Sequence, residues 1–305
     1  MNPLVATLAA LDSILLGKNE ALRLCLACLL ARGHLLIEDV PGVGKTTLAH
    51  ALARVLGLSW QRVQFTSDLL PADIIGVSVF DRATQQFQFR RGPVFTQLLL
   101  ADEVNRASPR TQSALLEAME ERQVSIDGIT HALPEPFFVV ATQNPHEQLG
   151  TFPLPESQLD RFLMRIELGY PDARHERALL AAADRRDQLQ SMTARLLPAQ
   201  LLQLQQQAQA AQVSPTLLDY VQKLVHATRN HADVQLGLSP RAAQGLVRAA
   251  RAWALIGGRS AVVPDDVQAV WAAVAGHRLQ FRERIGPADR GRATGDILRS
   301  VPVPA

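Results

Sequence analysis

At residues 39–46 the sequence reads Asp39-Val40-Pro41-Gly42-Val43-Gly44-Lys45-Thr46, between an apolar run and a helix-prone stretch. Apart from Asp39, it fits the pattern G-x-x-x-x-G-K-[ST]. Gly42 and Gly44 let backbone N–H groups turn toward phosphate oxygens, Lys45 supplies a positive charge, and the Thr46 hydroxyl can bind Mg²⁺. A helix that begins here adds the positive end of its dipole. We therefore predict a phosphate-binding loop made by Val40, Pro41, Gly42, Val43, Gly44, Lys45, Thr46 and Thr47.

Asp39 stands where the pattern has its first glycine. An aspartate tolerates unusual backbone angles better than most residues, but it brings a negative charge near the phosphates. We expect a modest nucleotide affinity for that reason. The alternative, on this loop alone, is a chance Gly-Lys-Thr turn after a strand.

A second motif strengthens the nucleotide-site interpretation. The apolar run Leu98 to Ala101 ends in two acids, Asp102 and Glu103. If this strand lies beside the one before the loop, Asp102 can hold Mg²⁺ through water. Glu103 can then polarise the water that attacks the γ-phosphate. The alternative is a polar pair that merely ends a buried strand.

Short apolar runs predict the strands of the fold. They lie at His34 to Glu38, Trp60 to Phe65, Gln97 to Asp102, Phe137 to Thr142 and Met164 to Leu168. Helical or turn-rich segments separate them, which indicates an α/β fold with a five-stranded parallel sheet covered on both faces. Val77 to Phe89 and Val124 to Leu133 interrupt the alternation, and each resembles a projecting hairpin.

After Pro171 the β-prone runs stop and the composition favours helices. We expect a core at residues 1–170, a connection at 171–195, a helical lid at 196–281 and a tail at 282–305. A chain of 305 residues has room for two such units.

Charge, apolar stretches and cysteine content argue against several classes of protein. There are 31 basic and 29 acidic side chains, so no global charge draws the chain to nucleic acid or anionic lipid. No apolar stretch approaches the ~20 residues that span a bilayer, and no basic leader precedes an apolar run, so we expect a cytoplasmic protein without membrane insertion. Cys25 and Cys28 have CxxC spacing, but they lie in an apolar, helix-like run without a second pair, which argues against zinc or redox chemistry.

With these motifs in place, the sequence resembles the MoxR family of AAA+ ATPases. The resemblance runs in family order from about Gly17 to Arg241. Besides the loop, it is carried by six blocks, one of which contains the two acids: Gln64 to Asp73, Gly92 to Phe95, Ala101 to Ala107, Ala141 to Pro145, Leu154 to Phe162 and Leu238 to Arg241. It implies an AAA+ P-loop core with a small C-terminal all-α lid, and Mg²⁺-dependent hydrolysis of ATP.

The resemblance also implies roles for single residues. Asn144 matches sensor 1, which orients the attacking water, although an Asn that caps a turn before Pro145 is the alternative. Arg161 matches the arginine finger, which reaches a nucleotide bound by a neighbouring subunit. A plain salt bridge from Arg161 to Asp160 or Glu156 is the alternative. Arg241 matches sensor 2, acting within its own subunit or across the interface, and Gly17 lies in a turn that resembles the one packing on adenine.

The implied function is a motor. The family suggests a hexameric ring, an adaptor protein with a von Willebrand factor A domain, and a protein client that is remodelled, matured or assembled. The two hairpins, the helix-2 insert and the pre-sensor-1 hairpin, would act on the client.

Two other classes stay open. A nucleic-acid motor would use Arg82, Phe87, Phe89, Arg90 and Arg91 of the first hairpin, although the second hairpin has little positive charge. An ATP-switched binding module with little turnover is the other, and a magnesium-chelatase-like motor subunit is a near relative in function.

Overall fold

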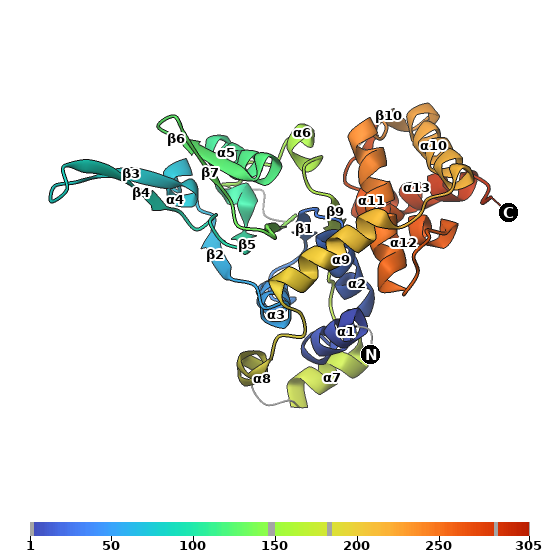
Figure 1. Ribbon diagram of the computed structural model, residues 1–305. Coiled ribbons are helices and arrows are strands. Elements are labelled where there is room, and N and C mark those ends of the chain that lie inside the picture. Colours follow the sequence, from blue (N-terminus) through green and yellow to red (C-terminus); the bar gives the residue numbers. More distant parts are fainter. Residues whose placement is uncertain (1–2, 146–149, 182–184, 284–285, 305) are drawn as a thin grey trace.

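The computed structural model describes residues 3–145, 150–181, 185–283 and 286–304. The remaining positions, 1–2, 146–149, 182–184, 284–285 and 305, fall in the expected core, connection and tail and lie outside the described residues. The described chain forms an α/β core and a mainly helical lid that lie side by side (Figure 1).

The core is built on one five-stranded sheet, and the strands lie where the apolar runs predicted them: β1 (Leu35–Glu38), β2 (Trp60–Gln64), β5 (Leu98–Asp102), β8 (Phe138–Gln143) and β9 (Met164–Ile166). Their order in the sheet is β2-β5-β8-β1-β9. Every neighbouring pair is parallel, so all carboxyl ends lie at one edge and all amino ends at the other.

Strict alternation along these strands sends side chains to two separate cores. Leu35, Leu98 and Phe138 join the larger core with the helices of one face: α1 (Pro3–Ile14), α2 (Asn19–Leu30) and α3 (Lys45–Val55). Leu36, Leu99 and Val139 join the second core, where they pack with α5. That face carries α4 (Pro71–Ile75), the 3-10 helix η1 (Val104–Arg106) and α5 (Pro109–Glu121).

Two antiparallel hairpins leave the core, as predicted. The first pairs β3 (Gly76–Asp81) with β4 (Gln86–Arg91), and the second pairs β6 (Gln123–Ile126) with β7 (Ile129–Ala132). The β3–β4 hairpin extends farthest from the body of the molecule (Figure 1).

The expected connection contains helices, and the lid begins after them. A short helix, α6 (Glu156–Leu159), precedes β9, and α7 (Ala173–Ala181) and α8 (Arg185–Ser191) follow it. After them, the described part of the chain forms five helices: α9 (Pro198–Ala210), α10 (Pro215–Asn230), α11 (Pro240–Ile256), α12 (Pro264–Ala275) and α13 (Pro287–Ser300). Helices α10 and α11 each begin with a Ser-Pro pair, in which the serine side chain accepts a backbone N–H and the proline occupies the first turn.

One sequence expectation for the C-terminal part is corrected. Residues 282–305 are not a tail, because α13 packs against α12: Ile297 is buried and Trp271 Nε1 donates to Thr294 O at 2.9 Å. The helical lid also contains one short antiparallel ladder, in which β10 (Val234–Leu236) pairs with β11 (Gln280–Phe281). Among the described residues, none of the helices combines the length and apolar character needed to span a bilayer.

Candidate functional site

The loop between β1 and α3 has the backbone of an anion cradle. Gly42 and Gly44 have φ angles of 86° and 97°, a region that glycine enters without strain. Gly44 is the N-cap of α3, an 11-residue helix, so the N–H groups of its first turn and the positive end of its dipole face the loop. Lys45 Nζ donates to the Asp39 carbonyl at 2.6 Å, which holds the lysine against the loop. These features suit the phosphates of a nucleotide.

Asp39 has a structural task that the sequence did not reveal. Its buried carboxylate accepts hydrogen bonds from three backbone N–H groups: Val40 at 2.8 Å, Leu168 at 2.6 Å and Gly169 at 2.7 Å. The negative charge is therefore neutralised in part by these donors, and the loop is tied to the segment after β9. The negative charge of Asp39 is therefore a weaker reason to expect a modest nucleotide affinity.

Asp102 ends β5 and is held from two sides. Thr142 Oγ1 on β8 donates to Oδ1 at 2.6 Å, while Arg62 on β2 donates to Oδ2 from Nη2 at 2.7 Å and from Nε at 3.1 Å. Thr142 Oγ1 also accepts from the Glu103 backbone N–H at 2.9 Å, so one hydroxyl positions both acids.

Glu103 follows with a φ of 57°, a left-handed conformation that is uncommon for a residue with a side chain. Gln64 Nε2 donates to its Oε2 at 2.7 Å, and Arg106 Nε lies 2.8 Å from the same oxygen. Arg62, Gln64 and Thr142 were not predicted. Gln64 lies opposite Asp102 in the β2–β5 register, so only the strand order could have revealed it.

Asn144 directly follows β8, the strand between β1 and β5. Because the carboxyl ends of parallel strands meet at one edge, the loop, the two acids and Asn144 converge there. The strand that carries the two acids does not lie directly beside β1, as the sequence suggested, because β8 separates the two. The loop, the two acids and Asn144 nevertheless lie at the same edge of the sheet, and their catalytic roles stay predictions.

Gly17 lies next to this edge, in the turn between α1 and α2. A Cβ added to Gly44 would lie 3.4 Å from Leu15 Cδ2, which places the turn against the loop. A cavity of about 480 Å³ opens between Gly17, Leu168 and the lid residues Ala273 and Thr294. The residues of the loop itself do not line it, so the adenine-packing role of Gly17 stays a prediction.

Arg161 and Arg241 lie elsewhere. Arg161 Nη1 lies 2.8 Å from Glu120 Oε2, and Arg241 Nη1 lies 2.9 Å from Glu120 Oε1. The expected alternative partners of Arg161 are not used: Asp160 pairs with Arg278 instead, at 2.6 Å. A small cavity joins these arginines to Gly33 and His34, just before β1, and to Leu163, just before β9. Both arginines therefore lie at the amino edge of the sheet, opposite the loop.

The donor set at the carboxyl edge fits Mg²⁺. Hard cations of this size take oxygen ligands; Asp102 offers a carboxylate at the end of β5, and Thr46 offers a hydroxyl at the start of α3, which begins at the same edge of the sheet. Arg62, which pairs with Asp102, has a side chain that is 45% exposed.

Comparison with known proteins agrees with this geometry. Residues 34–164 match the model of the ATPase family associated with various cellular activities (AAA), and residues 226–301 match an AAA lid domain. The chain is 44% identical to Chaperone MoxR1 of Mycobacterium tuberculosis, over 87% of this chain and 72% of that protein. It is 38% identical to Protein MoxR of Paracoccus denitrificans, over 97% and 95% of the two chains. A crystal structure of a protein assigned as an ATPase, from Cytophaga hutchinsonii, superposes with a TM-score of 0.88 at 34% identity, over 100% of this chain and 96% of that one.

Proposed function

This chain belongs to the MoxR family of AAA+ ATPases, and on that premise we propose that it hydrolyses ATP as a ring whose catalytic sites are each shared by two copies. In the proposed reaction the loop binds the phosphates and Glu103 takes up the proton of the attacking water. Asn144 orients that water, and ATP and water yield ADP and phosphate. Thr46 and Asp102 would hold Mg²⁺, which when bound offsets phosphate charge.

One observation carries the shared site: the phosphate loop and the two arginines lie at opposite edges of one sheet. Strand β1 has 4 residues, which at ~3.3 Å per residue separates its ends by about 13 Å. Arg161 cannot bridge that span through the sheet to the loop of its own chain. A second copy, placed with its loop against the Glu120 side of the first, would bring loop and arginines together.

This arrangement favours action in trans for both Arg161 and Arg241. Because the two guanidinium groups bind the same carboxylate, they lie at one spot, and a nucleotide that meets one meets the other. We propose Arg161 as the finger that stabilises charge in the transition state. Arg241, on the lid helix α11, would report the presence of that nucleotide to the lid.

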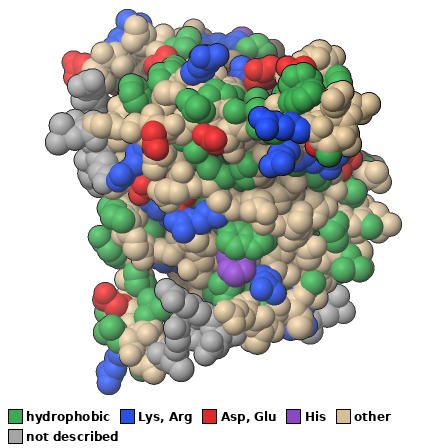
Figure 2. All heavy atoms as spheres, turned by 90° about the vertical axis from the view of Figure 1, so that its left-hand side faces the viewer, with side chains coloured by type: hydrophobic (Ala, Val, Ile, Leu, Met, Phe, Trp, Pro, Cys, Tyr) green, Lys and Arg blue, Asp and Glu red, His purple; other side chains and the backbone are tan. Residues whose placement is uncertain are grey.

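We further propose that the ring is hexameric and remodels a protein client in the cytoplasm, with a von Willebrand factor A domain protein as adaptor. The projecting β3–β4 hairpin supports contact with a client, since Phe80 and Phe87 are 49% and 73% exposed. On the face that carries this hairpin, basic side chains are scattered among hydrophobic and polar ones (Figure 2). A protein client fits this face better than a nucleic acid, which calls for a continuous basic track.

The test is steady-state ATPase activity against protein concentration, for the wild type, Glu103→Gln and Arg161→Ala, with the assembled mass measured in ATP. We expect the specific activity to rise with assembly. Both variants should lose nearly all activity while still binding ATP. If the wild type hydrolyses no ATP in any assembly state, an ATP-switched binding module replaces the motor.

A further inference from the structure

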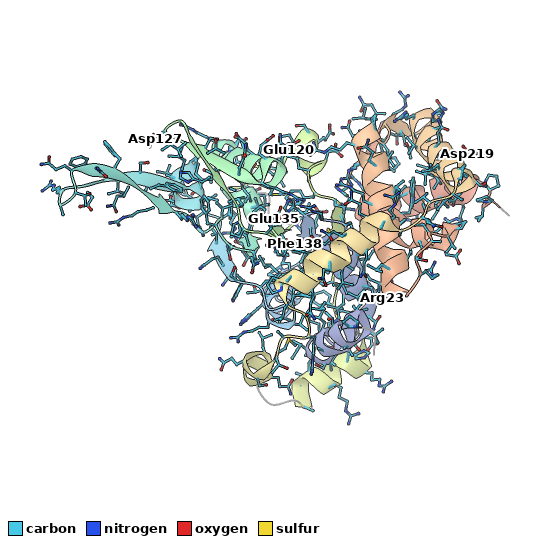
Figure 3. All side chains as sticks on the ribbon, viewed as in Figure 1. Arg23, Glu120, Asp127, Glu135, Phe138 and Asp219 are labelled. Atoms are coloured by element: carbon cyan, nitrogen blue, oxygen red, sulfur yellow. The ribbon has the colours of Figure 1, made fainter. Side chains whose placement is uncertain are left out.

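Glu120 lies in the last turn of α5, where that helix faces the lid (Figure 3). Each of its two carboxylate oxygens holds one arginine: Oε2 binds Arg161 at 2.8 Å and Oε1 binds Arg241 at 2.9 Å. We call the surrounding cavity of about 120 Å³ the Glu120 pocket; its charged lining residues are Arg32, Glu120, Arg122, Asp160, Arg161, Arg241, Arg248 and Arg278. Glu120 thus connects a core residue to a lid residue through a single group.

Positive charge exceeds negative charge in this pocket. Arg278 pairs with Asp160, and Arg32 pairs with Glu135. Arg161 and Arg241 share one carboxylate, while Arg248 has no carboxylate within salt-bridge distance in the described part of the chain. Burial, and to a lesser extent the charge of Arg241, lowers the pKa of Arg248, which indicates that its charge is poorly compensated. An additional anion would therefore be bound favourably here.

We propose that the Glu120 pocket is an anion-exchange site, in which the carboxylate of the separate subunit is replaced by the γ-phosphate of ATP bound to a second copy. The inference rests on the proposed function, because it requires Arg161 and Arg241 to act in trans. A terminal phosphate presents more oxygens and more negative charge than a carboxylate, so two or three guanidinium groups bind it more strongly. Glu120 then turns outward, where its side chain is already 31% exposed.

The exchange makes the interface sensitive to the nucleotide. ATP offers a γ-phosphate to the two arginines, whereas ADP does not, and Glu120 recaptures them. A group that stabilises the separate form raises the concentration needed for assembly, by the free energy of the contacts that must be broken. Glu120 is therefore the competitor that keeps ADP-loaded subunits apart.

The test replaces Glu120 with Gln, which keeps the shape and removes the charge. Glu117→Gln, on the same helix one turn earlier and exposed, is the matched control. We expect Glu120→Gln to lower the protein concentration for half-maximal ATPase activity by about three- to tenfold, the effect of losing two partly exposed ion pairs. Glu120→Gln should also assemble in ADP, and a measurement of the assembled mass in ADP would show this. Its ATPase rate at saturating protein concentration should equal that of the wild type. Glu117→Gln should match the wild type.

Two further measurements separate the outcomes. Glu120→Asp, whose carboxylate is too short to reach both arginines, should fall between Gln and the wild type, and thermal unfolding verifies that each variant folds. If Glu120→Gln raises the half-maximal concentration or lowers the saturating rate, Glu120 positions the arginines and the exchange is rejected. If Arg161→Ala keeps full activity, the proposed shared site itself fails, whatever Glu120→Gln does.

Discussion

Arg62 competes for the acid that we assign to the metal. Its guanidinium donates two hydrogen bonds to Asp102 Oδ2, while Thr142 occupies Oδ1. In the proposed metal site, a divalent ion that uses this carboxylate competes with Arg62, so we expect the arginine to raise the concentration of Mg²⁺ at which the site fills.

Removing Arg62 should therefore ease metal binding. We expect Arg62→Ala to lower the Mg²⁺ concentration for half-maximal ATPase activity by about two- to fivefold, because a partly exposed ion pair contributes up to about 1 kcal/mol. A Mg²⁺ titration at saturating ATP measures this. Arg54→Ala is the control, since Arg54 lies on α3 and bonds only His50 among the described side chains. An unchanged or raised Mg²⁺ requirement in Arg62→Ala would show that the arginine supports the site instead.

Sequence motifs predicted the residues to which we assign the chemistry, but they did not predict the residues that hold those side chains in place. Lys45 and Glu103 follow from short local patterns, because phosphate and water chemistry require those residue types. Arg62 and Glu120 belong to no such pattern, since their partners, Asp102 and Arg161, are distant in the chain. Only the strand order and the approach of α5 to α11 place them.

Among the elements, the β3–β4 hairpin is fixed at its base by two glycines. A Cβ on Gly76 would lie 2.3 Å from Arg90 O, and a Cβ on Gly92 would lie 2.3 Å from Ile74 O. Gly76 also has a φ of 100°. Beyond this base, Phe89 stacks on His131 of the second hairpin with ring centroids 4.3 Å apart, so the two hairpins are in contact.

Gly76→Ala should loosen the first hairpin without unfolding the core. We expect the hairpin to lose about 2–4 kcal/mol of local stability, because the left-handed backbone and the clash with the Arg90 carbonyl both disfavour alanine. Hydrogen exchange of the β3–β4 amides would show the loss locally. Gly128→Ala is the matched control: its φ is 78° but no atom lies within 4 Å of the added Cβ, so strain alone should cost about 1 kcal/mol. Equal effects of the two substitutions would contradict the role of close backbone packing.

His34 joins three elements, and its burial makes the fold sensitive to acid. Its Nδ1 accepts from Val139 N–H at 3.0 Å and its Nε2 lies 3.1 Å from Met119 O, to which it donates. Burial lowers the pKa of His34 from 6.5 to about 4. In the unfolded chain His34 binds a proton below about pH 6.5, whereas in the folded chain it binds one only below about pH 4. The free energy of unfolding therefore falls as the pH drops from 6.5 to 4.

In His34→Gln this part of the pH dependence should disappear. Between pH 6.5 and 4, the free energy of unfolding of the wild type should fall by up to about 3 kcal/mol more than that of the variant. Urea unfolding at each pH measures this difference. His277, whose pKa burial also lowers, would leave a remaining slope in the variant. His226→Gln, at an exposed position of α10, should retain the slope of the wild type. A variant curve parallel to that of the wild type would refute the assignment to His34.

Periodicity explains which elements could be predicted. The inner strands β5 and β8 are buried on both faces, so a short apolar run in the sequence predicts them, and both hairpins have turn residues between β-prone flanks. Helix α13 escaped prediction because it contains Gly291 and Gly295 and many charged side chains. Helix α13 is held by contacts with α12, among them the hydrogen bond from Trp271 to the Thr294 carbonyl. A local sequence pattern does not predict such a contact.

At the scale of the whole molecule, the sheet separates the two halves of the proposed shared site. The carboxyl edge carries the phosphate loop and the two acids, and the amino edge carries the arginines held by Glu120. The lid reaches the amino edge through Arg241 at the start of α11. Sequence resemblance left open whether Arg241 acts within its own chain. The three-dimensional arrangement favours a second copy, because Arg241 lies beside Arg161 and not beside the loop.

Separate half-sites make a specific prediction for mixtures of inactive variants. Lys45→Ala removes the phosphate-binding lysine from one edge, and Arg161→Ala removes the finger from the other, so each should be nearly inactive alone. In a mixed assembly, an intact loop of an Arg161→Ala copy meets an intact Arg161 of a Lys45→Ala copy, and that interface is complete. With random mixing at equal amounts, about one interface in four should be complete, so the mixture should recover roughly a quarter of wild-type activity if interfaces act independently.

The double variant mixed with either single variant is the control and should recover nothing, because no interface then combines both intact halves. If the equal mixture of single variants is as inactive as its components although mixed assemblies form, each chain completes its own site and the arginines act in cis.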